Sequence, residues 1–264
     1  MDLAADRLLI TCEHGGRRVP PRYRSLFAPH GELLRTHRGS DLGALAVARV
    51  LADELEAPLL AATVTRLLVD LNRSVGHPTL HSEEVTRPLP VSERREIVTR
   101  YYTPHRERIV AFVDAAVDQG GRAIHIASHS FTPNLDGDVR RADVGFLYDP
   151  ARPGEATLAA RWRAALKRRR PGLRLRRNYP YLGDSDGLAR TLRRRHPDAA
   201  YLGIELEVNQ ALLMHRGSAP AELAMDLARS LREALHGSPP KHATEQGAID
   251  GIADRSAPCH EGAP

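Results

Sequence analysis

Apolar residues along the chain form two kinds of pattern, short continuous blocks and longer stretches with helical spacing. Continuous blocks rich in leucine, isoleucine and valine are typical of strands that are buried on both faces of a sheet. Such blocks occupy residues 7–12, 59–71, 123–128, 144–149 and 200–208. The block at 59–71 is long enough for one or two strands, and each of the others predicts one strand.

The stretches with helical spacing lie between these blocks. One begins after residue 41, and the others cover residues 92–119, 155–170 and 219–236. Because Pro104 lacks an amide hydrogen to donate, we expect it to kink or divide the helix at 92–119. Strands that alternate with helices predict an α/β sandwich around a mostly parallel sheet.

Length and a change of composition near residue 237 set the expected domain limits. A chain of 264 residues that is 42% hydrophobic is long enough for one large α/β domain. Residues 238–264 are rich in glycine, proline, serine and charged residues and show no periodicity. We therefore expect a single domain over residues 1–237 and a disordered tail over residues 238–264.

The sequence carries no pattern for export or for a membrane span. Its apolar runs are all well short of the roughly 20 residues that cross a bilayer, and the opening MDLAADRLLI is no signal peptide. The two cysteines, Cys12 and Cys259, lie at opposite ends of the chain and form no CxxC pair. We therefore expect a cytoplasmic protein without a disulfide framework and without a membrane partner.

Basic charge is concentrated in one stretch. The net charge is +5, and the basic residues are 36 arginines and two lysines. Residues 161–177 hold nine of them and one aromatic residue, Trp162, which raises the alternative of a nucleic-acid-binding protein. Proteins that bind single strands stack bases on several aromatic side chains, and charge runs on helices are more often solvated faces. We expect no nucleic-acid partner.

Ionisable side chains follow several predicted strands, at the edge where ligands bind in open α/β sheets. His14 comes after the first strand, and His129 comes after the strand at 123–128. Imidazole is a common zinc ligand, and Gly15 and Gly16 would let a metal or substrate approach the backbone closely. The alternative is two loop histidines with local hydrogen bonds.

Asp41, Asn72 and Arg73 each have a functional and a structural interpretation. Asp41, or Ser40 before it, precedes an apolar helix and is favoured from the pattern alone as its N-cap, although a carboxylate could also be a third metal ligand. Asn72 and Arg73 follow the block at 59–71, where a guanidinium suits a substrate carboxylate. An ordinary turn with an exposed arginine is equally open.

Glu205 and Glu207 lie two residues apart in the predicted strand at 200–208, so they share one face of it. A carboxylate within an apolar strand is costly unless it is paired or functional. Beside a metal, such a group could act as the general base of a hydrolase. The structural alternative is the polar face of an edge strand.

Seven segments, in their order along the chain, resemble the N-formylglutamate amidohydrolase family. They cover roughly residues 8–235 and read CEHGGRRVP, HRGSDLG, VTRLLVDLNRS, SHSFTP, VGFLYD, NYPYLGDSDG and IELEVNQALLM. That family in turn is similar to zinc carboxypeptidases and aspartoacylase. The resemblance implies a phosphorylase/hydrolase-like fold, a three-layer α/β sandwich with a mixed, mostly parallel central sheet.

The resemblance also implies a role for each candidate residue. His14, Asp41 and His129 become the ligands of one divalent metal, for which zinc is expected. Glu207 becomes the catalytic base, and Glu205 either supports it or faces elsewhere. The remaining candidates contact the substrate: Asn72 and Arg73 at its carboxylate, and Arg140 or Arg141, Asn178 and Tyr181 elsewhere.

The implied activity is hydrolysis of the amide bond of a small acidic N-acyl amino acid such as N-formylglutamate. The first loop reads CEHGG, where the best-matched deformylases have a pattern closer to proline-histidine-serine-glycine, so the acyl group and the amino acid stay open. A non-catalytic metal-binding relative is a further alternative, and the retained Glu207 argues against it.

Overall fold

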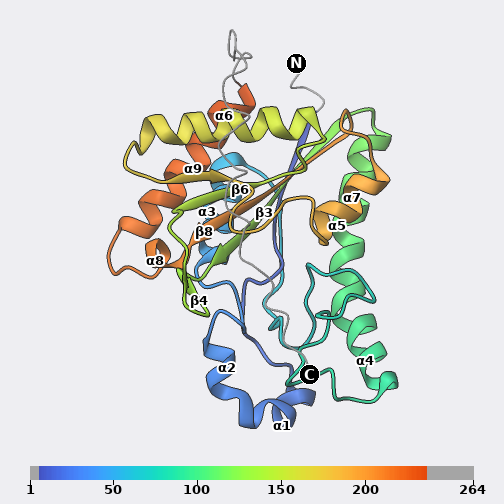
Figure 1. The fold of residues 1–264 in the computed structure, drawn as a ribbon. Helices are drawn as coiled ribbons and strands as arrows, with labels where there is room; N and C mark the ends of the chain where they lie inside the picture. The colour runs from blue at the N-terminus through green and yellow to red at the C-terminus, as the bar shows by residue number, and fades with distance from the viewer. Residues whose placement is uncertain (1–5, 237–264) are drawn as a thin grey trace, which may run out of the picture.

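The computed structural model describes residues 6–236, and at its centre lies a six-stranded sheet (Figure 1). In spatial order its strands are β2 (Leu59–Ala61), β1 (Asp6–Cys12), β3 (Arg122–Phe131), β8 (Tyr201–Asn209), β6 (Val144–Leu147) and β7 (Leu175–Arg177). Neighbouring strands of this sheet are parallel except for β6 and β8, which are antiparallel. The mixed, mostly parallel sheet that the sequence predicts is therefore confirmed.

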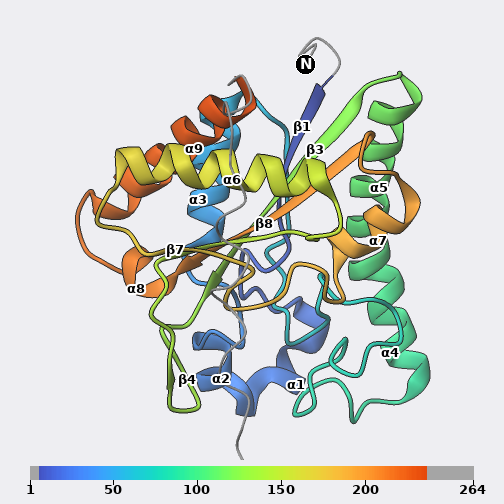
Figure 2. The same ribbon diagram turned by 45° about the horizontal axis from the view of Figure 1, so that its top comes forward.

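Helices cover both faces of the sheet and complete a three-layer sandwich, as Figure 1 and Figure 2 show. One outer layer consists of α3 (Ala44–Leu55), α6 (Pro153–Arg169) and α9 (Ala219–His236). The other consists of α5 (Thr103–Asp118), which contacts β3, and α7 (Leu188–Arg195), which contacts β8. The sheet is thus buried on both faces, as its continuous apolar strands predict.

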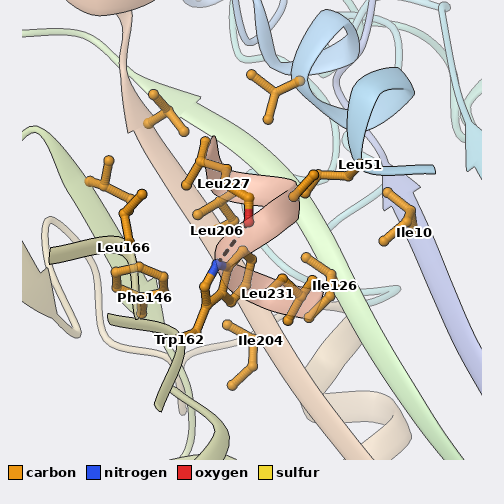
Figure 3. Close-up of a cluster of buried hydrophobic side chains, with 14 of the residues drawn as sticks. Ile10, Leu51, Ile126, Phe146, Trp162, Leu166, Ile204, Leu206, Leu227 and Leu231 are labelled. Carbon is orange, nitrogen blue, oxygen red and sulfur yellow. Dashed lines mark hydrogen bonds between the residues drawn. The ribbon is translucent and has the colours of Figure 1, made fainter. Parts of the chain in front are cut away.

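The core between the sheet and the α6–α9 layer is centred on Trp162 (Figure 3). This residue is fully buried, and its indole nitrogen donates to the backbone oxygen of Leu227 at 3.1 Å and to Ser230 Oγ at 3.0 Å. The ring of Phe146 packs edge-on against it, with the ring centroids 5.1 Å apart. The aromatic residue of the basic stretch at 161–177 is therefore a core residue.

A second apolar cluster lies beyond the carboxyl ends of the strands, at the bottom of Figure 1. Short helices contribute to this region: η2 (Pro21–Tyr23), α1 (Arg24–Phe27), η3 (Ala28–His30), α2 (Gly31–Arg35) and α4 (Val91–Ile97). Residues 65–71, predicted as strand, are turns and irregular segments, and their apolar side chains Leu68, Val69 and Leu71 are buried in this cluster. The strand prediction for 59–71 is therefore wrong beyond β2, because a short apolar run can be buried without joining a sheet.

Pro104 divides the helical stretch at 92–119, as predicted. The stretch consists of α4, a π-helical turn η4 (Val98–Tyr102) and α5, and Pro104 lies in the first turn of α5. The missing amide hydrogen is tolerated there, because the chain has changed its hydrogen-bond pattern just before the proline.

The remaining predicted elements agree with the structure within a few residues, apart from β3, which extends to Phe131. The sequence did not indicate β7, α7, the short helices at 21–35, the hairpin of β4 (Asn134–Leu135) and β5 (Asp138–Val139) or the short α8 (Gln210–Leu213). Within residues 6–236, every helix is too short or too polar to cross a membrane. The predicted tail at 238–264 lies outside the described residues, and the single domain over 1–237 stays a prediction.

Candidate active site

The carboxyl ends of β1, β3 and β8 bring candidate residues from three parts of the sequence together. His14 follows β1, whereas His129 lies inside β3. In the parallel register of β3 and β8, His129 is the direct partner of Glu207, and Ala127 is the partner of Glu205. Backbone pairing therefore places the candidate base beside a candidate metal ligand.

One oxygen of Asp41 is close to both histidines. Asp41 Oδ2 lies 3.3 Å from His14 Nδ1 and 2.9 Å from His129 Nδ1. One possible ligand atom from each residue lies within 4.8 Å of the other two, and all three residues are buried. Two imidazole nitrogens and one carboxylate oxygen around one point are the three protein ligands typical of a catalytic zinc site.

Asp41 is not the cap of α3, which corrects the interpretation favoured by the local pattern. The N-cap is Gly43, in a left-handed conformation with φ of 82°, and no side chain caps the helix. The backbone N–H of Asp41 donates to the backbone oxygen of His14 at 2.9 Å, which draws the two segments together. The Asp41 carboxylate is therefore free to face the histidines.

The far nitrogen of each histidine faces a second carboxylate. His14 Nε2 lies 2.7 Å from Asp70 Oδ1, and His129 Nε2 lies 3.3 Å from Glu13 Oε2. A carboxylate in that place keeps the proton on Nε2 and leaves Nδ1 available to a metal. The donor set and its outer carboxylates thus fit a divalent metal such as zinc.

Opposite charges within this cluster offset the cost of burying them. Burial by itself lowers the pKa of a histidine, but Asp70 and Asp41 raise the pKa of His14, and Asp41 and Glu13 raise the pKa of His129. Burial by itself raises the pKa of an aspartate, but the two histidines hold the pKa of Asp41 well below its usual range. A divalent cation would take the place of the histidine protons.

Glu207 differs from these carboxylates because none of its oxygens forms a hydrogen bond or an ion pair with a described residue, whereas Glu13, which also lacks a hydrogen bond, forms an ion pair with His129. Its Oε2 atom is buried without a hydrogen bond to any described residue. Burial raises the pKa of Glu207 to about 8; nearby Asp41 and Glu205 act in the same direction and His129 acts against it. A carboxyl group that titrates near neutral pH can both accept and return a proton.

The candidate residues line a cavity of about 200 Å³, a space for a small molecule. Seven of the predicted site residues line it: His14, Asp41, Asn72, Arg73, His129, Tyr181 and Glu207. The other residues of the lining are Arg66, Asp70, Ser130, Leu182, Ser185, Asp186 and Glu205.

Arg73 and Asn72 both line this cavity, but their side chains differ in how fully the protein occupies them with hydrogen bonds. Arg73 Nη1 donates to the backbone oxygen of Asp186 at 3.2 Å, and no carboxylate of the described residues forms an ion pair with Arg73. Asn72 Oδ1 accepts from the backbone N–H of Leu188 at 2.8 Å, and its side chain also hydrogen-bonds with Glu205. The guanidinium is therefore available to a substrate carboxylate, whereas Asn72 is held by the protein.

Arg140 and Asn178 are not part of the cavity lining, although Tyr181 is. Arg140 Nη1 donates to the Tyr181 hydroxyl at 3.0 Å. Asn178 Oδ1 accepts from the backbone N–H groups of Tyr148 and Gly183, at 2.9 and 3.3 Å, and so shapes the loop that carries Tyr181. Their contact with substrate stays a prediction, and their observed contacts are with the protein.

Three residues of the site received no role from the sequence. Arg66 donates to Asp41 Oδ1 at 3.1 Å and to Asp70 Oδ2 at 2.6 Å. Glu13 is 1% exposed and faces His129. Asp70 is the first residue of the DLNR motif, and Glu13 directly precedes His14. Closeness in sequence to assigned residues was the only indication for these two, and it does not predict which side chains are in contact.

The two glycines after His14 allow a close approach of backbone to backbone. A Cβ atom at Gly15 would lie 2.9 Å from the backbone oxygen of Ala62, and one at Gly16 would lie 2.6 Å from that of Thr63. Chain segment 62–63 thus occupies the space that the sequence suggested for a metal or substrate. The glycines set the path of the loop that presents His14.

Residues 161–177 offer no exposed aromatic side chain, because Trp162 is in the core. Four of the arginines in this stretch form ion pairs with acids of other segments: Arg168 and Arg169 with Glu233, Arg170 with Asp226, and Arg174 with Asp143. The stretch therefore lacks the stacking groups of a single-strand binder.

Known structures share the fold of this chain over most of its length. The chain is similar to the gene product Atu2144 from Agrobacterium tumefaciens, with 29% identity, a TM-score of 0.73, and coverage of 86% of this chain and 90% of that one. It is also similar to an N-formylglutamate amidohydrolase from Ralstonia eutropha JMP134, with 25% identity, a TM-score of 0.60, and coverage of 86% and 92%. None of the curated proteins matched. The N-formylglutamate amidohydrolase family model matches residues 6–214, which include every residue of the cavity, and the chain belongs to that family.

Proposed function

We propose that this protein hydrolyses the amide bond of a small N-acyl amino acid of the N-formylglutamate type and that it depends on a divalent metal, with zinc the expected ion. The observation that carries the proposal is the pairing of His129 with Glu207 across β3 and β8. It sets a carboxylate with an unpartnered oxygen beside the group formed by His14, Asp41 and His129. Family membership supports amide hydrolysis, and the donor set supports the metal.

Each group of site residues has a distinct role in the proposed hydrolysis. His14, Asp41 and His129 would hold the ion, which supplies Lewis acidity toward the acyl carbonyl and the attacking water. Glu207 takes a proton from that water and returns it to the nitrogen of the departing amine. The pKa of about 8 that burial gives Glu207 suits both steps, because the group gains and loses a proton near neutral pH.

Arg73 and Asn72, which also line the cavity, orient the substrate. Arg73 can grip the substrate α-carboxylate with two parallel hydrogen bonds, which fixes the position of the amide bond relative to Glu207. Asn72 accepts from the backbone N–H of Leu188 and so maintains the shape of the wall. The volume of about 200 Å³ limits the substrate to a small molecule.

Elemental analysis together with an activity screen tests the proposal. We expect about one equivalent of metal in the native protein, loss of it in His14→Ala and His129→Ala, and hydrolysis of N-formyl amino acids only by the loaded protein. His215→Ala, at an exposed histidine outside the cavity, is the control. Full metal content in both ligand variants would place the metal elsewhere and remove the basis of the proposal.

The cytoplasmic location and the absence of a nucleic-acid partner are also proposals. Buried Cys12 and the core position of Trp162 agree with them. Fractionation of source cells and a salt titration of binding to single-stranded nucleic acid would test them directly.

A further inference from the structure

A second cleft, here called the α4 cleft, lies beside α4 at the lower right of Figure 1. It is lined by residues of the loop at 75–81, by Arg87 and by residues of the helical stretch at 91–99. Its volume is about 550 Å³, which is in the usual range for small-molecule sites. The α4 cleft and the cavity of the candidate active site have no lining residue in common, so the two are separate spaces.

The ionisable side chains that line the α4 cleft are all basic. They are Arg87, Arg94, Arg95, His77 and His81, and no acidic residue is part of the lining. Arg87 pairs with Glu83 at 3.6 Å, whereas neither Arg94 nor Arg95 forms an ion pair within the described part of the chain. Two guanidinium groups at this cleft therefore have no paired carboxylate.

Two residues of the lining each carry a buried nitrogen atom without a hydrogen-bond partner among the described residues. These atoms are Nδ1 of His81 and Nε of Arg94. Burial and the nearby charge of Arg94 lower the pKa of His81, as expected when no anion offsets that charge. An anion in the α4 cleft would accept a hydrogen bond from Arg94 and favour a proton on His81 as a second donor.

Apolar side chains line the same cleft. Val75 and Val91 are 68% and 54% exposed, and Pro78, Leu80 and Val98 complete the apolar part of the lining. Contact with a hydrocarbon group would remove the two exposed valines from water, which favours binding. The lining thus offers contacts to a charged group and to an apolar group of one molecule.

We propose that the α4 cleft is a second binding site, for a small organic anion whose carboxylate or phosphate group contacts Arg94 and Arg95 and whose apolar part contacts Val75 and Val91. Guanidinium groups bind both kinds of oxyanion, because their N–H donors match the spacing of the oxygens. The site lies outside the cavity of the candidate active site and does not depend on the proposed function.

Four small probes test the class of ligand by calorimetric titration of the metal-loaded, full-length protein. We expect butyl phosphate and butyrate to bind. Butanol lacks the charge and inorganic phosphate lacks the apolar part, so each should bind about tenfold or more weakly than butyl phosphate. Binding of one organic anion alone supports the site and identifies its charged group. Binding of neither, or equal binding of inorganic phosphate or butanol, would overturn the inference.

Substitution of the two unpaired arginines tests where the anion binds. Arg94→Gln and Arg95→Gln should each weaken the binding of butyl phosphate by about tenfold, because a charge-assisted hydrogen bond is lost. Arg100→Gln is the matched control, since Arg100 is exposed, lies outside the lining and pairs with Glu96 at 2.8 Å. Thermal unfolding shows whether each variant is folded.

Val91 allows a test that leaves every arginine in place. It is the first residue of α4 and is 54% exposed, so a polar side chain of similar size can replace it. Val91→Asp should weaken the binding of butyl phosphate about fivefold more than Val91→Asn does, because a carboxylate repels the anion. Native affinity in Arg94→Gln, Arg95→Gln and Val91→Asp would place the anion elsewhere on the protein and overturn the inference.

Discussion

Two sides of the candidate cavity differ in how their carboxylates are paired: the proposed metal side, with His14, Asp41, Asp70 and His129, and the β8 side, with Glu205 and Glu207. On the metal side, both oxygens of Asp70 are bonded, one to His14 at 2.7 Å and the other to Arg66 at 2.6 Å. On the β8 side, Glu207 has an oxygen with no partner among the described residues. A buried polar group without a hydrogen bond costs roughly 1–3 kcal/mol, so such a group needs an explanation.

This difference suggests separate roles for the two sides, metal binding on one and proton transfer on the other. The metal side is built by contacts within the protein, which hold His14, Asp41 and His129 in place before any substrate arrives. In the proposed mechanism, the partner of the unbonded Glu207 oxygen is the proton of the attacking water. Changes on the two sides should therefore affect different measurements, metal affinity on one and turnover on the other.

The largest effect is expected for Glu207→Gln. The amide keeps the shape of the side chain but cannot accept the proton, so kcat should fall by about two to four orders of magnitude. Metal content and thermal stability should stay close to those of the native protein. Turnover at the native rate would show that Glu207 is not the base, and Glu205→Gln would be the next variant to measure.

The next largest effects are expected for the carboxylates behind the two histidines, Asp70 and Glu13. Asp70→Asn and Glu13→Gln should each weaken zinc binding by about 10–100-fold, because the histidine loses the group that orients it. The larger loss is expected for Asp70, which is 2.7 Å from His14, whereas Glu13 is 3.3 Å from His129. Competition with a chelator of known affinity measures both.

A matched control for these variants exists outside the cavity. Asp114 lies 2.8 Å from His196 Nε2, so Asp114→Asn removes a similar contact far from the metal ligands. It should leave zinc affinity unchanged. Equal zinc affinity in Asp70→Asn, Glu13→Gln and Asp114→Asn would mean that the outer carboxylates do not support the site.

The sequence predicts the sheet well and the region beyond it poorly. Continuous apolar runs such as 123–128 gave real strands because both faces of this sheet are covered by helices. Residues 65–71 have the same composition but form turns, because their side chains fill the separate cluster around Tyr23 and Ile97. Apolar composition predicts that a segment is buried. It does not predict whether the segment is buried in a sheet or in another cluster, because tertiary packing determines that.

For the site, the sequence could place residues but not their contacts. His14 and His129 were recognisable at strand ends, and the strand register then determined that His129 meets Glu207. Asp41 was ambiguous because a helix start favours the same residue type as a metal site, and only the position of Gly43 as N-cap decides between them. Arg140 was a substrate candidate, and its burial behind Tyr181 depends on a loop conformation that no local pattern encodes.

Zinc affinity should depend on pH through the two histidines. Carboxylates raise the pKa of His14 and His129 above the ordinary value of 6.5, so below the raised values both rings carry an extra proton in the metal-free protein. Binding must release those protons, and affinity should fall as the pH falls through the raised values, by about tenfold per pH unit for each proton released. Zinc titrations at several pH values, with proton release measured in two buffers, test whether the affinity falls as the pH falls. An affinity that is constant with pH would contradict the charge assignment.

The smallest effect, and the one that sharpens the comparison most, is expected for Arg73→Lys. Arg73 is held by one backbone oxygen, so a lysine keeps the charge without disturbing an ion pair of the protein. An ammonium cannot form two parallel hydrogen bonds to a carboxylate, so KM should rise by about tenfold while zinc affinity stays unchanged. Arg22→Lys, at an exposed arginine that pairs with Glu96, controls for the substitution itself. A change in zinc affinity would show that substrate binding and metal binding are not separate, and an unchanged KM for an N-formyl amino acid would contradict the role of Arg73.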